Sequence, residues 1–203
     1  MSTTKIKICG LTSVGDAQLA ASLGADFLGV IFAESPRRIA VSRAQEIRAA
    51  VPSAALVGVF KNQPLADVIT TALSCDLDFV QLHGAESPSY CNDVLERANK
   101  PIVKAFRGAR VPDAATLASF RTTSYFLFDI ERGAATDDAW NDVANARALG
   151  FRVFVAGGLD ASNVRAIVAR TSPFAVDVCR GVEHEPGIKD ALALERFMME
   201  ARA

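Results

Sequence analysis

Residues 151–183 read FRVFVAGGLDASNVRAIVARTSPFAVDVCRGVE, and this stretch contains the repeating unit of the whole chain. An apolar run that begins at Phe151 is followed by a Gly-Gly turn and a segment of helical period, and a second apolar run begins at Phe174. Both runs are nearly continuous rather than alternating, which is typical of parallel strands covered on both faces. The stretch therefore predicts a strand–helix–strand unit.

The same unit recurs along the chain. Strand-like runs begin at eight positions, namely Lys5, Asp26, Ala55, Asp78, Pro101, Ser124, Phe151 and Phe174. Each interval leaves room for a loop, a helix of about 10 to 14 residues and a second loop. Eight such units favour a closed (β/α)8 barrel, an α/β fold formed by residues 1–203 as one domain, over an open doubly wound sheet. The nucleotide-binding form of that sheet is disfavoured because no G-x-G-x-x-G motif follows the first run.

Composition excludes several classes of protein. The 203 residues are 50% hydrophobic, and 22 Lys and Arg stand against 23 Asp and Glu, a net charge of −1. Such a chain is not disordered, and its charge gives no reason to expect nucleic acid or a membrane surface as a partner. The apolar run 27–33 is too short to cross a bilayer and no apolar leader precedes it, so we expect a cytoplasmic protein. The cysteines, which have no metal-binding spacing and are expected to be reduced, are Cys9, Cys75, Cys91 and Cys179.

Two reactive side chains end strand-like runs on different sides of the expected barrel, whose active site lies at the C-terminal ends of its strands. Cys9, followed by Gly10, would serve as a proton-abstracting base if a nearby cation or helix terminus lowered its pKa; alternatively it is a small core residue. Asp129 would stay protonated as a general acid if partly desolvated; alternatively it caps the next turn or pairs with Arg132. An acid and a base that face one substrate suit a proton-shuttling isomerase.

Glycines at the same end of the expected barrel suit phosphate binding. Gly157 and Gly158 precede a helix that Asp160 or Ser162 would cap, and Gly181 follows the last strand. Their backbone N–H groups would cradle a phosphate, or else form plain tight turns.

Arginine and histidine side chains in these loops suit other ligand groups. Arg37 or its neighbour Arg38 would clamp a carboxylate, and the other would be a solvated loop residue. His83 is either an acid–base or ligand-binding group or a structural histidine beside Gly84. His184 has no companion, so no metal site is expected.

Five stretches together resemble one family. They are KICGLT (7–12), DFLGVIFAESPRR (26–38), VQLHGAE (80–86), AGGLDASNV (156–164) and PFAVDVCRGVEHEPGIKD (173–190). In this order, over nearly the whole chain, they resemble the phosphoribosylanthranilate isomerase family of tryptophan biosynthesis. The resemblance implies a (β/α)8 barrel without cofactor or metal. It also implies an Amadori rearrangement, in which an N-aryl aminoaldose phosphate becomes a 1-amino-1-deoxyketose phosphate.

The resemblance assigns roles to individual residues. Asp129 matches the general acid that protonates the furanose ring oxygen, and Cys9 matches the general base that takes the proton from C2. Arg37 would hold the anthranilate carboxylate. Backbone amides of Gly158 and Gly181, with their neighbours, would hold the phosphate.

The last strand and one loop depart from the family's pattern. Asp177 matches an aspartate that would orient the substrate's hydroxyls, but Cys179 and Arg180 stand where the family has Ser-Ser. Arg180 would grip a phosphate or a second acidic group at the rim of the site. The stretch 129–140 also lacks the family's glycine-rich segment. Because the acid–base pair is retained while the binding residues change, we expect an active isomerase.

Three functions remain compatible with these residues. The first is isomerisation of N-(5-phosphoribosyl)anthranilate, and the second is isomerisation of a different N-substituted aminosugar phosphate by a paralogue. The third is a catalytically retired barrel that binds a phosphorylated metabolite or a protein. A monomer and a homodimer are both compatible with the sequence.

Overall fold

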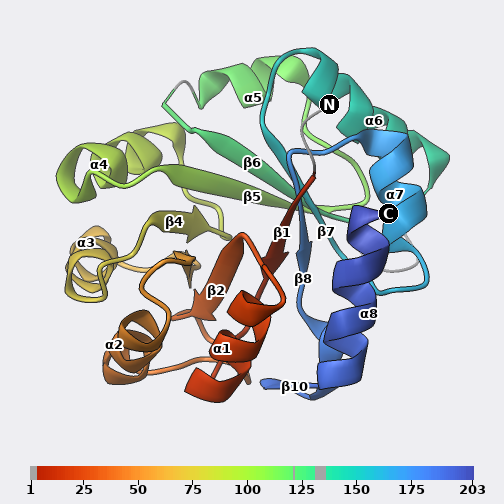
Figure 1. Cartoon of the computed structure of the whole chain (residues 1–203). Helices are drawn as coiled ribbons and strands as arrows, with labels where there is room; N and C mark the ends of the chain where they lie inside the picture. The colour runs from red at the N-terminus through yellow and green to blue at the C-terminus, as the bar shows by residue number, and fades with distance from the viewer. Residues whose placement is uncertain (1–3, 121, 131–135) are drawn as a thin grey trace.

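The computed structural model describes residues 4–120, 122–130 and 136–203, and it confirms the closed barrel (Figure 1). Its parallel strands are β1 (Lys5–Ile8), β2 (Phe27–Ile31), β3 (Ala55–Phe60), β4 (Phe79–Leu82), β5 (Ile102–Gly108), β6 (Tyr125–Ile130), β7 (Val153–Ala156) and β8 (Ala175–Val178). Each strand pairs with the next in chain order, and β8 pairs with β1. All eight predicted strands are confirmed, and the open doubly wound sheet is excluded.

Helices surround the strands (Figure 1). They are α1 (Val14–Ser22), α2 (Val41–Ala50), α3 (Leu65–Ser74), α4 (Pro88–Ala98), α5 (Ala114–Ser119), α6 (Asp137–Ala148), α7 (Val164–Thr171) and α8 (Ala191–Arg202). Between β8 and α8 the chain forms a short 3-10 helix, η1 (Arg180–Val182), and a small hairpin of β9 (Glu183–Glu185) and β10 (Ile188–Lys189). Across the ranges given above, no helix is long and apolar enough to span a membrane.

Local hydrogen bonds set the ends of the helices. Asp190 caps α8 by accepting a hydrogen bond from the backbone N–H of Ala193 at 2.9 Å. The predicted cap of α7 by Asp160 or Ser162 is wrong, because Asn163 occupies the N-cap position without a side-chain hydrogen bond. The Asp160 carboxylate instead accepts from the backbone N–H of Ser162 at 2.9 Å, within the turn that precedes the helix.

Aromatic side chains fill the barrel interior near the N-terminal ends of the strands. The ring of Phe27 packs edge-on against Phe79 at a centroid distance of 5.4 Å, and it also contacts Phe154 at 5.3 Å. Tyr125 and Phe174 extend this cluster, with ring centroids 5.0 Å apart. Because these rings occupy one end of the barrel, the polar side chains of the interior gather at the other end.

Candidate active site

A cavity of about 1020 Å³ lies at the C-terminal ends of the strands. Its lining includes every residue that the sequence predicts for the site: Cys9, Arg37, His83, Asp129, Gly157, Gly158, Asp177, Cys179, Arg180 and Gly181. The closed barrel brings these residues together from β1, β2, β4, β6, β7, β8 and the loops that follow them, as is usual for active sites of this fold.

A buried ion pair joins the first and last strands below Cys9. Lys7 of β1 is the register partner of Asp177 of β8, and Lys7 Nζ lies 3.0 Å from Asp177 Oδ1. Burial is the largest single effect and lowers the pKa of Lys7, but the charges and hydrogen bonds of Asp177 and Cys9 together outweigh it and raise the pKa, so Lys7 is an ammonium. Lys7 is therefore a cation beside Cys9, one of the two groups that the sequence interpretation considered for lowering the pKa of the thiol.

Despite this cation, Cys9 is a neutral thiol in the unliganded chain. Burial raises the pKa of the Cys9 thiol, and the charge and hydrogen bond of Lys7 lower it only in part. The space for both side chains comes from Gly29 of the neighbouring strand. A Cβ at this glycine would lie 2.9 Å from Cys9 Sγ and 3.1 Å from Lys7 Nζ, so any larger residue would displace one of them.

Replacing Lys7 by methionine is expected to lower the free energy of unfolding by about 3–5 kcal/mol, because it leaves the buried Asp177 carboxylate unpaired. Chemical denaturation followed by circular dichroism measures this loss. A Lys7→Met/Asp177→Leu variant removes both charges and should recover most of it. A loss below about 1 kcal/mol in the single variant, which is the usual contribution of an exposed ion pair, would contradict the prediction.

Asp129 lies beside a histidine and an arginine from other units of the barrel. His83 Nε2 lies 3.4 Å from Asp129 Oδ2, and Arg107 Nε lies 3.9 Å from the same oxygen. Burial alone would raise the pKa of Asp129, but the hydrogen bond and charge of His83 outweigh it and lower the pKa, with smaller effects of Arg107 and Arg180. The expectation that desolvation keeps Asp129 protonated is therefore wrong for the unliganded chain. The alternative pairing with Arg132 lies outside the described residues.

His83 is oriented through its other ring nitrogen. Gln81 Nε2 lies 3.1 Å from His83 Nδ1, and the backbone N–H of His83 donates to the carbonyl of Phe60 at 2.8 Å. Nε2 is thereby turned toward Asp129 at the cavity wall. His83 thus belongs to the surroundings of the candidate general acid.

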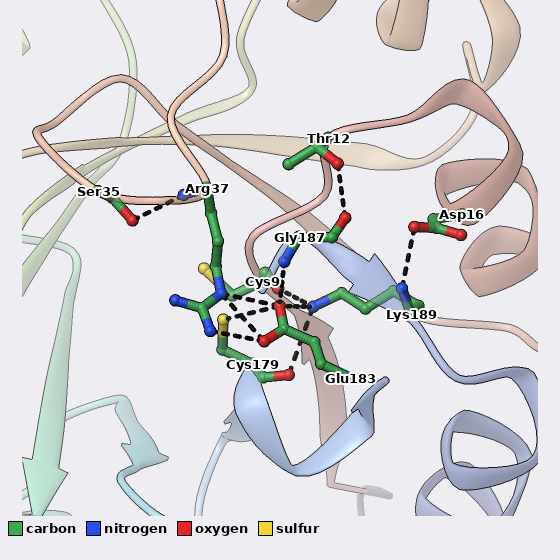
Figure 2. A network of polar contacts seen from close by, with 9 residues as sticks. All are labelled: Cys9, Thr12, Asp16, Ser35, Arg37, Cys179, Glu183, Gly187 and Lys189. Carbon is green, nitrogen blue, oxygen red and sulfur yellow. Dashed lines mark hydrogen bonds and ion pairs between the residues drawn. The ribbon is translucent and has the colours of Figure 1, made fainter. Parts of the chain in front are cut away.

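Arg37 already holds a carboxylate of the chain itself. Its Nε and Nη2 atoms donate to both carboxylate oxygens of Glu183, at distances of 2.6 to 3.1 Å (Figure 2). Nη1 makes no hydrogen bond with the residues that the structure describes, so it remains for a ligand. Arg38 is exposed, as expected for the solvated member of the pair.

The glycines after β7 and β8 are required by backbone geometry. Gly157 and Gly158 have φ angles of 99° and 64°, a left-handed conformation that side chains disfavour. A Cβ at Gly157 would overlap the carbonyl of Ile130, and one at Gly181 would overlap the carbonyl of Leu159. The two loops therefore pack closely at the cavity. Both glycines precede the helix α7, which begins at Val164, as expected.

The two residues after β8 that depart from the family's pattern have different environments. Cys179 Sγ lies 3.7 Å from Glu183 Oε1, and burial raises the pKa of this thiol to about 12. Arg180 is exposed at the rim of the cavity. In the departing loop over 129–140, residues 131–135 lie outside the described part of the chain.

Sequence reasoning missed three buried lysines that organise the site, namely Lys7, Lys104 and Lys189. Lys104 Nζ lies 3.0 Å from Glu86 Oε2 and donates to the carbonyl of Gly84 at 2.6 Å, next to His83. A lysine inside an apolar strand, as in KIKI or PIVKAF, is the signal that would have found two of them, because lysine is rarely buried unless paired. Among the described residues, no group of three or more His, Cys, Asp or Glu side chains is placed to hold a metal ion.

Comparison with known proteins identifies the family. The family model described as N-(5'phosphoribosyl)anthranilate (PRA) isomerase matches residues 6–200. The chain belongs to the PRA isomerase family. The PRA isomerase of Citrifermentans bemidjiense is 42% identical over 98% of this chain and 97% of its own. That of a Geobacter species is also 42% identical, over 98% of both chains.

Solved PRA isomerases share the barrel. The structure from Thermotoga maritima has a TM-score of 0.89 at 32% identity, over 98% of both chains. The structure from Thermus thermophilus has a TM-score of 0.85 at 35% identity, over 97% of this chain and 98% of its own. A further PRA isomerase, with a TM-score of 0.85 at 32% identity over 98% of both chains, is in complex with reduced 1-(o-carboxyphenylamino)-1-deoxyribulose 5-phosphate.

Proposed function

We propose that this chain isomerises N-(5-phosphoribosyl)anthranilate to the corresponding 1-amino-1-deoxyketose phosphate. The observation that carries the proposal is the placement of Cys9 and Asp129 in one cavity of a PRA isomerase barrel. The two side chains come from β1 and β6, which β7 and β8 separate, so they approach a bound ligand from different sides.

In the proposed reaction, the two residues move one proton each. Asp129 protonates the furanose ring oxygen, the bond from C1 to that oxygen breaks, and a Schiff base forms. Cys9 then takes the proton from C2, which gives an enolamine that tautomerises to the ketone. General acid–base catalysis of this kind contributes about two to four orders of magnitude for each group.

Binding groups surround this pair. The Nη1 edge of Arg37 receives the anthranilate carboxylate, and the loops of Gly158 and Gly181 receive the phosphate. Asp177, which lines the cavity while paired with Lys7, orients the ribose hydroxyls. Arg180 at the rim adds a positive charge for the phosphate.

The pH dependence of kcat/KM follows from the two pKa shifts. The reactive form of the enzyme has a Cys9 thiolate and a neutral Asp129 carboxylic acid. Because the pKa of Asp129 is lowered and that of Cys9 is raised, only a minor fraction of the enzyme is in this form. That fraction is constant at every pH between the two pKa values. We therefore expect kcat/KM to be level from about pH 7 to about pH 9 and to fall only above that range. Initial rates across this range, at subsaturating substrate, measure the profile. A fall centred between pH 7 and 8 would mean that the pKa of Cys9 is lowered instead.

Turnover by the purified protein tests the proposed function. N-(5-phosphoribosyl)anthranilate is generated in the assay, and the loss of anthranilate-type fluorescence reports its conversion. Turnover that scales with the concentration of the chain supports the proposal. A folded protein that binds the product analogue without turnover would indicate a retired barrel. One that neither binds nor converts it would redirect the search to other N-substituted aminosugar phosphates.

We further propose a cytoplasmic protein that is a monomer or a homodimer. The four cysteines are free thiols, which accords with a reducing compartment. A related PRA isomerase from Thermotoga maritima, at 32% identity, is described as dimeric. Sedimentation equilibrium distinguishes the two states.

A further inference from the structure

The Glu183 carboxylate is the centre of a polar network beside the cavity (Figure 2). It is 4% exposed, and its Oε2 accepts from Arg37 Nη2 at 2.6 Å and from Nε at 3.1 Å. Its Oε1 accepts from the same Nε at 2.8 Å. A planar guanidinium held at two nitrogens has a fixed plane and direction, which one contact would not impose.

The same carboxylate binds a second cation that reaches the candidate base. Lys189 Nζ lies 3.0 Å from Glu183 Oε1 and donates to the carbonyls of Cys9 at 2.6 Å and Cys179 at 3.4 Å (Figure 2). The backbone N–H of Gly187 also donates to Oε1, at 3.3 Å. Glu183 therefore ties the guanidinium to the ends of the two strands that carry the thiols.

The charge balance of this network favours an anionic ligand. Burial alone would raise the pKa of Glu183, but the hydrogen bond of Arg37 and the charge of Lys189 outweigh it and lower the pKa, so the carboxylate stays ionised. Among the residues that the structure describes, Glu183 is the single carboxylate in contact with both Arg37 and Lys189, so it leaves one positive charge of these two side chains uncompensated. Because Nε and Nη2 face Glu183, that charge is presented to the cavity at the Nη1 edge.

Arg37 also lies close to the reacting end of the site. Its Cδ would be 2.6 Å from a Cβ at Gly10, the residue that follows Cys9. The absence of a side chain at this position, where φ is 74°, lets the arginine lie over the end of β1. A carboxylate bound at Nη1 is thereby held near the strand end that carries the thiol.

We propose that Glu183 is a positioning residue that selects substrates bearing an aryl carboxylate. It acts through Arg37, whose Nη1 edge it directs into the cavity, and it contributes to binding rather than to proton transfer. This inference rests on the proposed function, because it assumes that the aryl carboxylate of the substrate enters this cavity.

The experiment compares two ligands and three variants. The ligands are reduced 1-(o-carboxyphenylamino)-1-deoxyribulose 5-phosphate and its 1-phenylamino counterpart, which lacks the carboxyl group; titration calorimetry gives Kd. In Glu183→Gln, one carboxylate oxygen that accepts hydrogen bonds is replaced by an amide NH2 group, which faces the cations Arg37 and Lys189. We therefore expect Kd for the carboxylated ligand to rise about tenfold or more. Kd for the other ligand should be unchanged, and kcat for N-(5-phosphoribosyl)anthranilate should stay within about threefold while KM rises.

A double-mutant cycle shows whether Glu183 acts through Arg37. In Arg37→Met, the preference for the carboxylated ligand should disappear, and adding Glu183→Gln should cause no further loss. Asp16→Asn is the matched control, because Asp16 accepts from the backbone N–H of Lys189 at 3.1 Å within the same network but does not bind the guanidinium. It should leave the ratio of the two Kd values unchanged.

Each outcome decides the inference. If Glu183→Gln weakens both ligands equally, or neither, or adds to Arg37→Met, Glu183 is not a positioning residue for the carboxylate. If Glu183→Gln does not fold, the variant Arg37→Lys is used in its place. The single ammonium of the new lysine would pair with Glu183, so the preference for the carboxylated ligand should again be lost. A retained preference would overturn the inference. A wild-type chain that binds neither ligand would overturn the proposed function, and this inference with it.

Discussion

Replacing Cys9 by alanine is expected to reduce kcat by about two to four orders of magnitude, the usual effect of removing a general base. The thiol lines the cavity beside Lys7, and its removal deletes the group that accepts the proton from C2. Alanine leaves no acceptor there, and the neighbouring Lys7 cannot replace it, because Lys7 is a protonated ammonium paired with Asp177.

Two measurements make this result specific to proton transfer. The Kd of the reduced product analogue should stay within a few-fold of the wild-type value, since Cys9 is not expected to hold the phosphate or the carboxylate. Cys91→Ala is the matched control, because Cys91 is a buried thiol of α4 outside the cavity, and it should retain wild-type kcat. A Cys9→Ala variant with more than a tenth of wild-type kcat would remove Cys9 from the mechanism.

Replacing Asp129 by asparagine is likewise expected to reduce kcat by about two to four orders of magnitude. The amide keeps the shape of the side chain and can still meet His83, which lies 3.4 Å away, but it has no acidic proton for the ring oxygen. Because the loss concerns the transition state, KM should change little.

The control for this variant is Asp26→Asn. Asp26 is a partly exposed, ion-paired aspartate like Asp129, with side-chain exposures of 29% and 24%, but it pairs with Lys5 at the opposite end of the barrel. In steady-state measurements, the kcat of Asp129→Asn should therefore be lower than that of Asp26→Asn by orders of magnitude. Equal activities would show that Asp129 only maintains the structure around His83.

The architecture was predictable from sequence because it depends on local patterns. Each strand is a short, nearly continuous apolar run, and these runs place the observed strand starts within two residues of the predicted ones, as at Asp26 for Phe27 and Phe151 for Val153. The candidate site followed from the same pattern, since the fold puts polar strand ends around one cavity.

The electrostatics of the site were not predictable in this way. The apolar run that ends at Asp129 indicated desolvation, but the net pKa shift depends on His83, which β4 supplies from far along the chain. Likewise, nothing near Arg37 in sequence indicates that Glu183 already holds its guanidinium. Contacts between side chains that are distant in sequence exist only once the barrel closes, and single-sequence patterns carry no record of them.

The order of synthesis gives this arrangement a further consequence. Lys7, Cys9 and Arg37 leave the ribosome early, whereas Asp177, Glu183 and Lys189, which neutralise or secure them, leave it late. An incomplete nascent chain therefore contains both proton-transfer residues but has no counter-ions for the cations around the thiol. Burying those cations unpaired would be costly. The electrostatic surroundings of Cys9 therefore form only when residues 177–189 have joined the barrel.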